Sequence, residues 1–202
     1  MTQSVRILDY IHAPCSGAEL AAFITEAFES AGHKDGGQAA LVHHLRNDPE
    51  RAVQFPNEFV AVDEKTGELV GHVFLSRTKI TTAYGDEIGA VLLAPVCVKQ
   101  DRRSHGIGAA LIEEGLRQCR IANEKWMVVL GDPGYFARFG FKPFAEYGLT
   151  VEGDPTGELL PFSQVLPLTD PAEKPELLDK ARVDFLMGYA ESDTRSVTVT
   201  FA

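Results

Sequence analysis

A basic turn that contains glycine lies near the middle of the chain, between an apolar run and a helical pattern. Residues 96–111 read VCVKQDRRSHGIGAAL, so β-branched residues lead into the turn and apolar residues at helical spacing follow it. Such a turn can direct several backbone N–H groups at one point, at the positive end of a helix dipole. Glycine lets the backbone approach a ligand closely because it has no Cβ. The segment therefore predicts an anion site suited to a phosphate or a diphosphate.

The local charge agrees with this interpretation. Lys99, Arg102 and Arg103 against Asp101 give a net charge of +2, in a chain whose formal net charge is −10. The guanidinium of Arg103 can offer a charge-assisted fork to phosphate oxygens. We therefore expect Arg103 to contact the phosphate.

Other phosphate-binding motifs fit this turn less well. A Walker A loop needs Lys-Ser or Lys-Thr after its glycines, and neither dipeptide follows them here. A dinucleotide fingerprint needs a third glycine where this chain has Leu111. The pattern that remains is Arg-x-x-Gly-x-Gly, which residues 103–108 match at every fixed position. The plain alternative is a turn made pliable by glycine, with incidental arginines.

A second segment with strong local signals follows at residues 126–143, which read WMVVLGDPGYFARFGFKP. Five apolar residues predict a buried strand. Asp132 occupies the position of a helix N-cap and Pro133 that of the first helical residue, which is a strong start signal. Gly140 is expected to end this short helix before the next extended piece begins.

Together the two segments resemble the coenzyme A pyrophosphate loop and the second signature of the GCN5-related N-acetyltransferase (GNAT) superfamily. The similarity is good over residues 55–145, and it is nearest to a poorly characterised bacterial subgroup of predicted N-acetyltransferases. It implies an α/β GNAT fold: a mixed, mostly antiparallel twisted sheet of about seven strands, with helices on both faces and a splay between the fourth and fifth strands. It also implies an acetyl-CoA-dependent enzyme that moves an acetyl group to a primary amine by direct transfer in a ternary complex.

The resemblance further implies which residues contact acetyl-CoA. They are Val96, Cys97, Val98, Arg103, Ser104, His105, Gly106, Ile107, Gly108, Ala109, Phe136 and Phe139. Backbone N–H groups around Val96 to Val98 are expected to polarise the thioester carbonyl. The thiol of Cys97 lies in this stretch, and we expect it to be a small buried hydrophobe rather than a nucleophile.

The proton donor for the leaving thiolate departs from the family pattern. Many relatives have a tyrosine four residues before the glycine of Gly-Phe, and this chain has Phe136 there. Tyr135 is one residue earlier, a rotation of about 100° on a helix. Tyr135 is our candidate catalytic acid. It can instead pack or line the substrate site, with water as the donor.

The general base is left open by the sequence. Some relatives carry a glutamate on the fourth strand, but residues 90–98 contain no carboxylate. His72, on the expected third strand, has the right intrinsic pKa for a base near neutral pH. The other candidates are Asp86, Glu87, His43 and His44, together with a water chain to a surface carboxylate.

Composition sets the limits around these motifs. With 202 residues, 45% of them apolar, the chain is expected to form one GNAT domain over residues 1–202, with residues 170–202 as a C-terminal extension. No apolar run approaches 18 residues and no signal segment is present, so we expect a cytoplasmic protein without a membrane partner. Three cysteines without a C-x-x-C pair predict neither a disulfide framework nor a metal site.

The negative net charge argues against nucleic acid as a partner and suits a small-molecule or peptide amine as substrate. The resemblance adds a possible homodimer, because many relatives are dimers. Two alternatives to the enzyme stay open. One is an acyl-CoA-binding sensor or partner-binding protein that has lost catalysis. The other is a dinucleotide-binding oxidoreductase, which the glycine spacing disfavours.

Patterning predicts the elements that position these residues. Strands are expected near residues 4–9, 57–63, 69–77, 88–98 and 158–168, and helices near 14–30, 36–46 and 106–122. Pro95 lies inside the fourth strand, where proline marks a bulge or an edge. In GNAT proteins that strand bulges and its splay admits the pantetheine arm. Beyond the family core we expect a helix around Leu177 to Leu186 and an extended segment from Ser196 to Phe201.

Overall fold

The computed structural model describes residues 4–32, 37–169 and 178–185. The strands are β1 (Val5–Asp9), β2 (Glu58–Asp63), β3 (Leu69–Thr81), β4 (Glu87–Val98), β5 (Trp126–Leu130), β6 (Lys142–Pro143), β7 (Thr150–Val151), β8 (Ser163–Pro167) and β9 (Arg182–Val183). The helices are α1 (Gly17–Glu29), α2 (Gly37–Asn47), α3 (Ile107–Ile121) and α4 (Pro133–Phe136), and short 3₁₀ turns join several of them.

One mixed, mostly antiparallel sheet organises the fold. Its main path runs β1-β2-β3-β4-β5-β8-β6, which gives the seven strands that the sequence predicts. Along this path every pairing is antiparallel except that of β4 with β5. The two-residue strands β7 and β9 lie off the path, and β9 also pairs with β3. Neither of these short strands was predicted.

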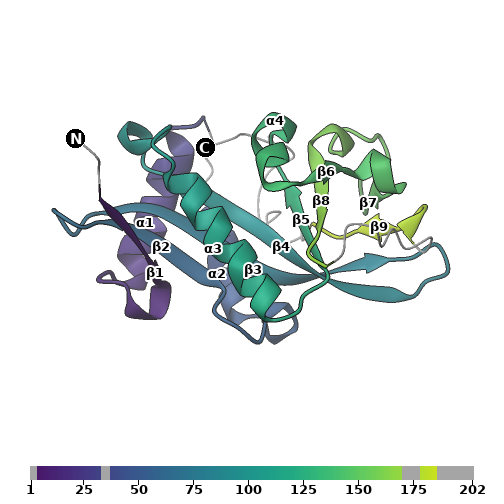
Figure 1. The fold of residues 1–202 in the computed structure, drawn as a ribbon, viewed down its shortest axis with the longest axis horizontal. Coiled ribbons are helices and arrows are strands. Elements are labelled where there is room, and N and C mark those ends of the chain that lie inside the picture. Colours follow the sequence, from purple (N-terminus) through teal and green to yellow (C-terminus); the bar gives the residue numbers. More distant parts are fainter. Residues whose placement is uncertain (1–3, 33–36, 170–177, 186–202) are drawn as a thin grey trace.

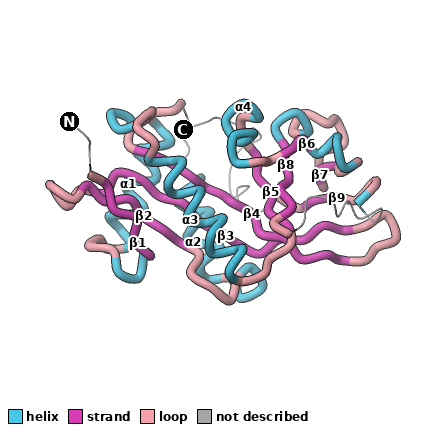
Figure 2. Tube along the Cα trace, in the orientation of Figure 1, coloured by secondary structure: helices cyan, strands magenta, loops and turns pink. Residues whose placement is uncertain are grey.

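Helices cover both faces of the sheet, as predicted. In Figure 1, α3 crosses in front of the central strands while α1 and α2 lie behind them, and Figure 2 shows the same layers by element type. The apolar stripe of α3 is buried at every expected position: Ile107, Leu111, Ile112 and Leu116. A Cβ at Gly71 of β3 would lie 2.8 Å from a methyl of Leu111, so glycine there lets α3 approach the sheet.

The sheet opens between β4 and β5. Only two residue pairs join these strands, Val91 with Met127 and Leu92 with Val128, although β4 continues to Val98. Against β3, the register shifts by one residue between Leu93 and Val96, which places the bulge at Ala94–Pro95. This confirms the expected distortion at Pro95. Past Leu92, the β4 edge that faces β5 has no strand partner from residues 4–32, 37–169 or 178–185.

The helix expected around Leu177 to Leu186 is wrong for the part that the structure describes. Arg182–Val183 forms β9, which pairs with Ile80 and Thr81 at the far end of β3. Pairing with that strand outweighs the local apolar spacing, because strand formation depends mainly on its neighbours. The ring of Phe185 stacks on Phe144, with centroids 5.5 Å apart.

The segment from Ser196 to Phe201 lies outside the described residues, as do residues 170–177 and 186–195. Within the described ranges, no helix combines the length and the apolar character needed to cross a membrane.

Candidate active site

The turn between β4 and α3 has the backbone of an anion site. Ser104 and Gly106 adopt positive φ angles of 63° and 84°, which turn the chain sharply into α3. Gly106 is the N-cap of α3 and provides no side-chain cap. The first N–H groups of a helix have no intrahelical acceptor, so those of residues 107–109 need one from outside the helix. Because Ser104, His105 and Gly106 are exposed, a phosphate can reach these groups.

The basic side chains of the turn are already paired. Lys99 bonds to Glu68, and Arg102 donates to Asp63 over 2.8 Å. An anion bound at this turn would therefore depend more on the backbone N–H groups and the helix dipole than on free cations.

Arg103 makes contacts that differ from the expected phosphate fork. Its Nη2 donates to the carbonyl of Ala27 and to the Ser30 hydroxyl, both over 2.8 Å, at the end of α1. Its Nε donates to the carbonyl of Val98 over 3.2 Å. The guanidinium thus joins the end of α1 to the end of β4. A direct contact between Arg103 and phosphate stays a prediction, and it would require these bonds to rearrange.

We expect Arg103→Ala to lower the free energy of unfolding by about 1–3 kcal/mol, because the carbonyls of Val98 and Ala27 and the hydroxyl of Ser30 each lose a hydrogen bond. Affinity for acetyl-CoA should change less than threefold, with little dependence on salt. Urea denaturation and calorimetry at two salt concentrations measure both quantities. Arg103→Lys is the control, since one ammonium cannot reach all three acceptors. A tenfold loss of affinity that grows at low salt, with unchanged stability, would instead support the predicted contact between Arg103 and phosphate.

Two backbone N–H groups of β4 point into the opening beside β5. Lys99 N–H donates to the carbonyl of Val70 on β3 over 3.0 Å. Because successive N–H groups of an extended strand alternate in direction, those of Val98 and Val96 point away from β3. They face the side on which β5 has diverged. These are the donors that a thioester carbonyl or a pantetheine amide would need.

The side chain of Cys97 is fully buried on the face of the sheet that α1 and α2 cover, away from α3. Burial raises the pKa of its thiol to about 12. A thiol in this state is neutral near pH 7 and a poor nucleophile. The geometry thus agrees with the expectation that Cys97 serves as a small hydrophobe.

Aromatic residues after β5 pack on the same side of the sheet as α3. Phe136 is buried, and a Cβ at Gly131 would lie 2.3 Å from its ring, so Phe136 fills space at the end of β5. Tyr135 and Phe139 are half-buried, with ring centroids 5.7 Å apart. Of the predicted aromatic contacts with acetyl-CoA, Phe139 is thus more open to a ligand than Phe136.

The hydroxyl of Tyr135 lies against the first turn of α3. A Cβ at Gly108 would be 2.8 Å from Tyr135 Oη. Burial raises the pKa of this phenol, so it keeps its proton at neutral pH. The guanidinium of Arg138 covers the ring at 4.5 Å. This position puts the hydroxyl beside the predicted diphosphate loop.

The candidate bases lie in different places. His72 is buried on β3, with Nε2 2.8 Å from Glu58 Oε1. His43 and His44 are exposed on α2. Asp86 and Glu87 lie at the far end of the β3–β4 hairpin, where Glu87 pairs with Lys79.

Sequence reasoning missed the partners of His72. The carboxylate of Glu58 also accepts from Arg46 Nε over 2.7 Å. The available signal was Glu58, the first residue of an apolar strand, because a glutamate that is buried there needs a hydrogen-bonding or charged partner.

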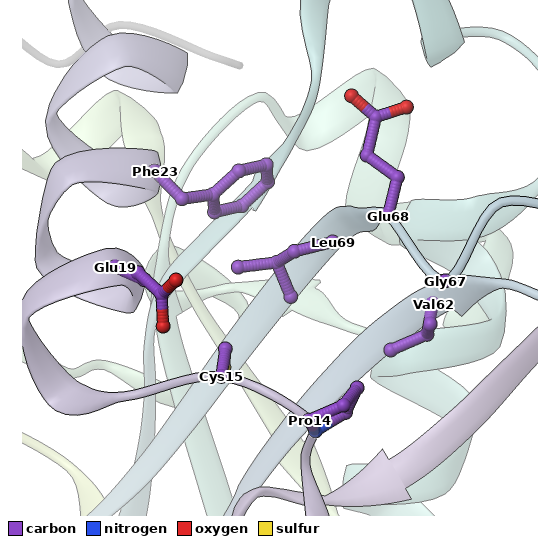
Figure 3. Close-up of a pocket in the computed structure, with 8 residues that line it drawn as sticks. All are labelled: Pro14, Cys15, Glu19, Phe23, Val62, Gly67, Glu68 and Leu69. Carbon is purple, nitrogen blue, oxygen red and sulfur yellow. The ribbon is translucent and has the colours of Figure 1, made fainter.

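A separate pocket of about 220 Å³ lies between the start of α1 and the β2–β3 turn (Figure 3). Its lining residues are Pro14, Cys15, Glu19, Phe23, Val62, Gly67, Glu68 and Leu69. None of them belongs to β4, β5 or α3, so this pocket is not the opening described above. In the described part of the chain, no cluster of three His, Cys, Asp or Glu side chains is arranged to hold a metal ion.

Comparison with known proteins adds a second line of evidence. No family model matches the chain. Over 139 residues, however, it is 30% identical to the uncharacterized N-acetyltransferase YhbS of Escherichia coli K12. The aligned residues make up 69% of this chain and 75% of that protein.

Solved structures of two bacterial proteins are also similar. The GNAT family N-acetyltransferase YhbS from Escherichia coli, in complex with CoA, superposes with a TM-score of 0.65 at 26% identity, over 91% of this chain and 89% of that one. A GNAT family acetyltransferase from Brucella melitensis, in complex with acetyl-CoA, gives a TM-score of 0.62 at 29% identity, over 84% and 90% of the two chains. With the β4–β5 splay and the turn before α3, these similarities show that the chain belongs to the GNAT family of N-acetyltransferases.

Proposed function

We propose that the protein binds acetyl-CoA and transfers its acetyl group to a primary amine of a small molecule or peptide, directly in a ternary complex. The observation that carries the proposal is the presence of backbone donors in two neighbouring segments. The N–H groups of Val96 and Val98 face the opening, and the uncapped first turn of α3 begins at Ile107, after the basic turn. The CoA and acetyl-CoA complexes of the two similar structures support the same ligand.

In this proposal, the turn before α3 and the end of β4 have separate tasks. The backbone of residues 104–109 binds the diphosphate, with Gly108 allowing close approach. Val96 N–H polarises the thioester carbonyl and Val98 N–H orients the arm that carries it. Acetyl-CoA supplies an activated acyl group, and the chain must orient the amine, remove its proton and protect the site from water.

The proposal extends to the setting of the reaction. We place the enzyme in the cytoplasm as one domain over residues 1–202, with neither nucleic acid nor membrane as a partner. Gel filtration with light scattering tests whether it forms a homodimer.

A screen tests the function. Acetyl-CoA is incubated with the protein and with polyamines, amino acids, aminoglycosides or peptides with free N-termini. Product mass and thiol release are measured, and calorimetry measures acetyl-CoA binding separately. Acetylated product supports the enzyme. Absence of acetyl-CoA binding contradicts the proposal altogether.

A non-catalytic acyl-CoA-binding protein is the second candidate. Phe136 replaces the tyrosine that many relatives use, and residues 90–98 contain no carboxylate. Tight acetyl-CoA binding without transfer to any amine in the screen would favour this alternative.

We expect Tyr135→Phe to leave kcat within about twofold, because its hydroxyl lies at α3, and to raise the KM for acetyl-CoA. If Tyr135 protonates the thiolate instead, kcat should fall by roughly 10²-fold with binding nearly unchanged. Steady-state kinetics with a confirmed acceptor separates the two. Phe136→Tyr is the companion variant, and an increase in its kcat would show that a missing acid limits the wild type.

A further inference from the structure

A buried histidine on β3 has one ring nitrogen without a partner. The side chain of His72 is fully buried, and its Nδ1 has no hydrogen-bond partner among the described residues. Its Nε2 is 2.8 Å from Glu58 Oε1. A buried polar atom without a partner is rare in folded proteins and costly, so a polar group from outside the fold is a natural explanation.

The partners of His72 determine which nitrogen carries the proton. Burial alone would raise the pKa of Glu58, but hydrogen bonds from His72 and Arg46, together with their charges, hold it below its ordinary value. Glu58 is therefore ionised and accepts a hydrogen bond from Nε2–H. Burial lowers the pKa of His72, so the ring is neutral at neutral pH. The unpartnered Nδ1 consequently presents a lone pair, which makes it a proton acceptor.

His72 lies beside the strand that faces the opening. In the β3–β4 pairing it is directly opposite Cys97, between Val96 and Val98. Neighbouring strands are about 4.8 Å apart, so the imidazole is one strand away from the backbone donors proposed to bind the thioester. Its side chain is on the face covered by α1 and α2, whereas Tyr135 and Phe139 line the α3 face. A base on this face suits an acceptor amine that approaches from the side of α1 and α2, opposite the rings of Tyr135 and Phe139.

A second buried polar atom that has no hydrogen-bond partner in the described part of the chain lies on the same face of β3. It is Oγ of Ser76, four residues after His72, and residues at even spacing on a strand share a face. Ser76 is opposite Leu92, the last β4 residue that pairs with β5. The two unpartnered groups therefore flank the segment of β4 where the opening begins.

We propose that His72 Nδ1 is the general base of the transfer reaction, accepting the proton of the acceptor's ammonium group directly or through one water. Glu58 and Arg46 are positioning residues: Glu58 fixes the tautomer and stabilises the imidazolium, and Arg46 fixes Glu58. This inference rests on the proposed function. It assigns a base from β3 to a family member whose fourth strand carries no carboxylate in residues 90–98.

The proton balance is complete. The ammonium gives one proton to Nδ1, and the freed nitrogen forms a bond to the carbonyl carbon as the C–S bond breaks. The departing thiolate takes the second proton from that nitrogen, which leaves an amide and a thiol. The imidazolium returns its proton to solvent, so one proton is released per turnover.

Several charged or titratable groups surround this ring. They are Glu58 from β2, Arg46 from α2 and the neutral thiol of Cys97 from β4, with the thiol of Cys15 close to Glu58. Protonation of His72 is opposed by burial and by Arg46, and favoured by Glu58. A base of this kind stays active below the ordinary histidine pKa, so kcat/KM should not fall until the pH is below about 6.5.

Two small amines of different basicity test the proposal. Ethylamine is protonated at neutral pH and needs a base. In 2,2,2-trifluoroethylamine, the electron-withdrawing group keeps the nitrogen mostly unprotonated, so it needs none. We expect His72→Gln to lower kcat/KM for ethylamine by roughly 10²-fold and for trifluoroethylamine by less than threefold. The ethylamine rate of the variant should then rise with pH.

Controls separate this role from a structural one. His12→Gln removes an exposed histidine and should change neither rate. Equal losses for both amines, or an ethylamine loss that is the same at every pH, would overturn the assignment of His72 as the base. Acetyl-CoA affinity measured by calorimetry shows whether the variant is folded.

A second measurement needs no turnover. Nitrogen-15 NMR of the full chain, compared with His72→Gln, should find Nε2 protonated and Nδ1 unprotonated at neutral pH. A proton on Nδ1 would refute the proposal. If the wild type binds acetyl-CoA but acetylates neither these two amines nor any amine in the screen, the proposed function has failed on its own, and the NMR result still decides the state of Nδ1.

Discussion

Gly108→Val should reduce the affinity for acetyl-CoA at least tenfold, which corresponds to a loss of about 1.4 kcal/mol of binding free energy. Gly108 is the second residue of α3, and its N–H is one of those without an intrahelical acceptor. A branched side chain there would hold the diphosphate away from these donors. It would also meet Tyr135 Oη at 2.8 Å and a methyl of Val98 at 3.5 Å, measured from the position of the new Cβ.

The clash with Tyr135 requires its own control. Removing the hydroxyl in a Gly108→Val, Tyr135→Phe double variant relieves that contact without restoring access to the backbone. We expect the double variant to bind acetyl-CoA as weakly as Gly108→Val alone. Recovery of affinity in the double variant would mean that displacement of Tyr135, rather than loss of backbone contact, caused the defect.

Gly115→Ala is the matched control within the same helix. A Cβ there would make only ordinary contacts of 3.4 Å with Leu75, and alanine is a better helix former than glycine. Its affinity for acetyl-CoA, measured by calorimetry, should equal that of the wild type. Unchanged affinity in Gly108→Val would contradict the assignment of the turn as the diphosphate site.

The features that the sequence predicted best depend on neighbouring residues. Asp132 caps α4 through the N–H of Gly134, and the apolar stripe of α3 follows from helical spacing. Pro95 indicated the bulge of β4 because proline cannot complete a strand ladder. Such signals act over a few residues, so they could be recognised without knowledge of the fold.

The features that were missed depend on contacts between distant segments. Arg103 bonds to Ala27, 76 residues earlier, a partner that local charge could not indicate, while its contact with phosphate stays a prediction. The partnership of Glu58 with His72 depends on the register of β2 against β3, which patterning does not fix. The pairing of β9 with β3 has the same origin. Candidate catalytic groups are therefore harder to predict than the cofactor loop, because they are assembled across the sheet.

Arg46→Met should lower the free energy of unfolding by about 3 kcal/mol at pH 7.5. The variant leaves Glu58, which is almost fully buried, without its cationic partner, and breaking a buried ion pair from one side is strongly destabilising. Arg46 also lies over the ring of Tyr10 at 4.5 Å, and methionine preserves part of that packing. Urea denaturation at several pH values measures the effect.

Arg117→Met is the matched control, because Arg117 pairs with Glu114 on the surface of α3. Its loss should cause no measurable change in stability, since exposed pairs of this kind contribute little. A difference between the two variants therefore reports burial rather than the loss of an arginine.

The effect of Arg46→Met should shrink as the pH falls. In the wild type the pKa of Glu58 is held low, so its stabilising contribution is present above the ordinary glutamate value of about 4.3 and is lost as the pH falls through the lowered value. Without Arg46 that pKa rises, and a protonated Glu58 tolerates burial.

His72 acts in the same direction. Its pKa is lowered in the folded protein, so the unfolded chain takes up a proton first and the wild type loses stability below about pH 6.5. Arg46 contributes to that lowering, and its removal weakens this loss. The wild type should therefore lose more stability than the variant between pH 7.5 and 4.5. A difference that stays constant over this range would mean that Arg46 stabilises α2 by packing alone, and that Glu58 and His72 do not titrate as a unit.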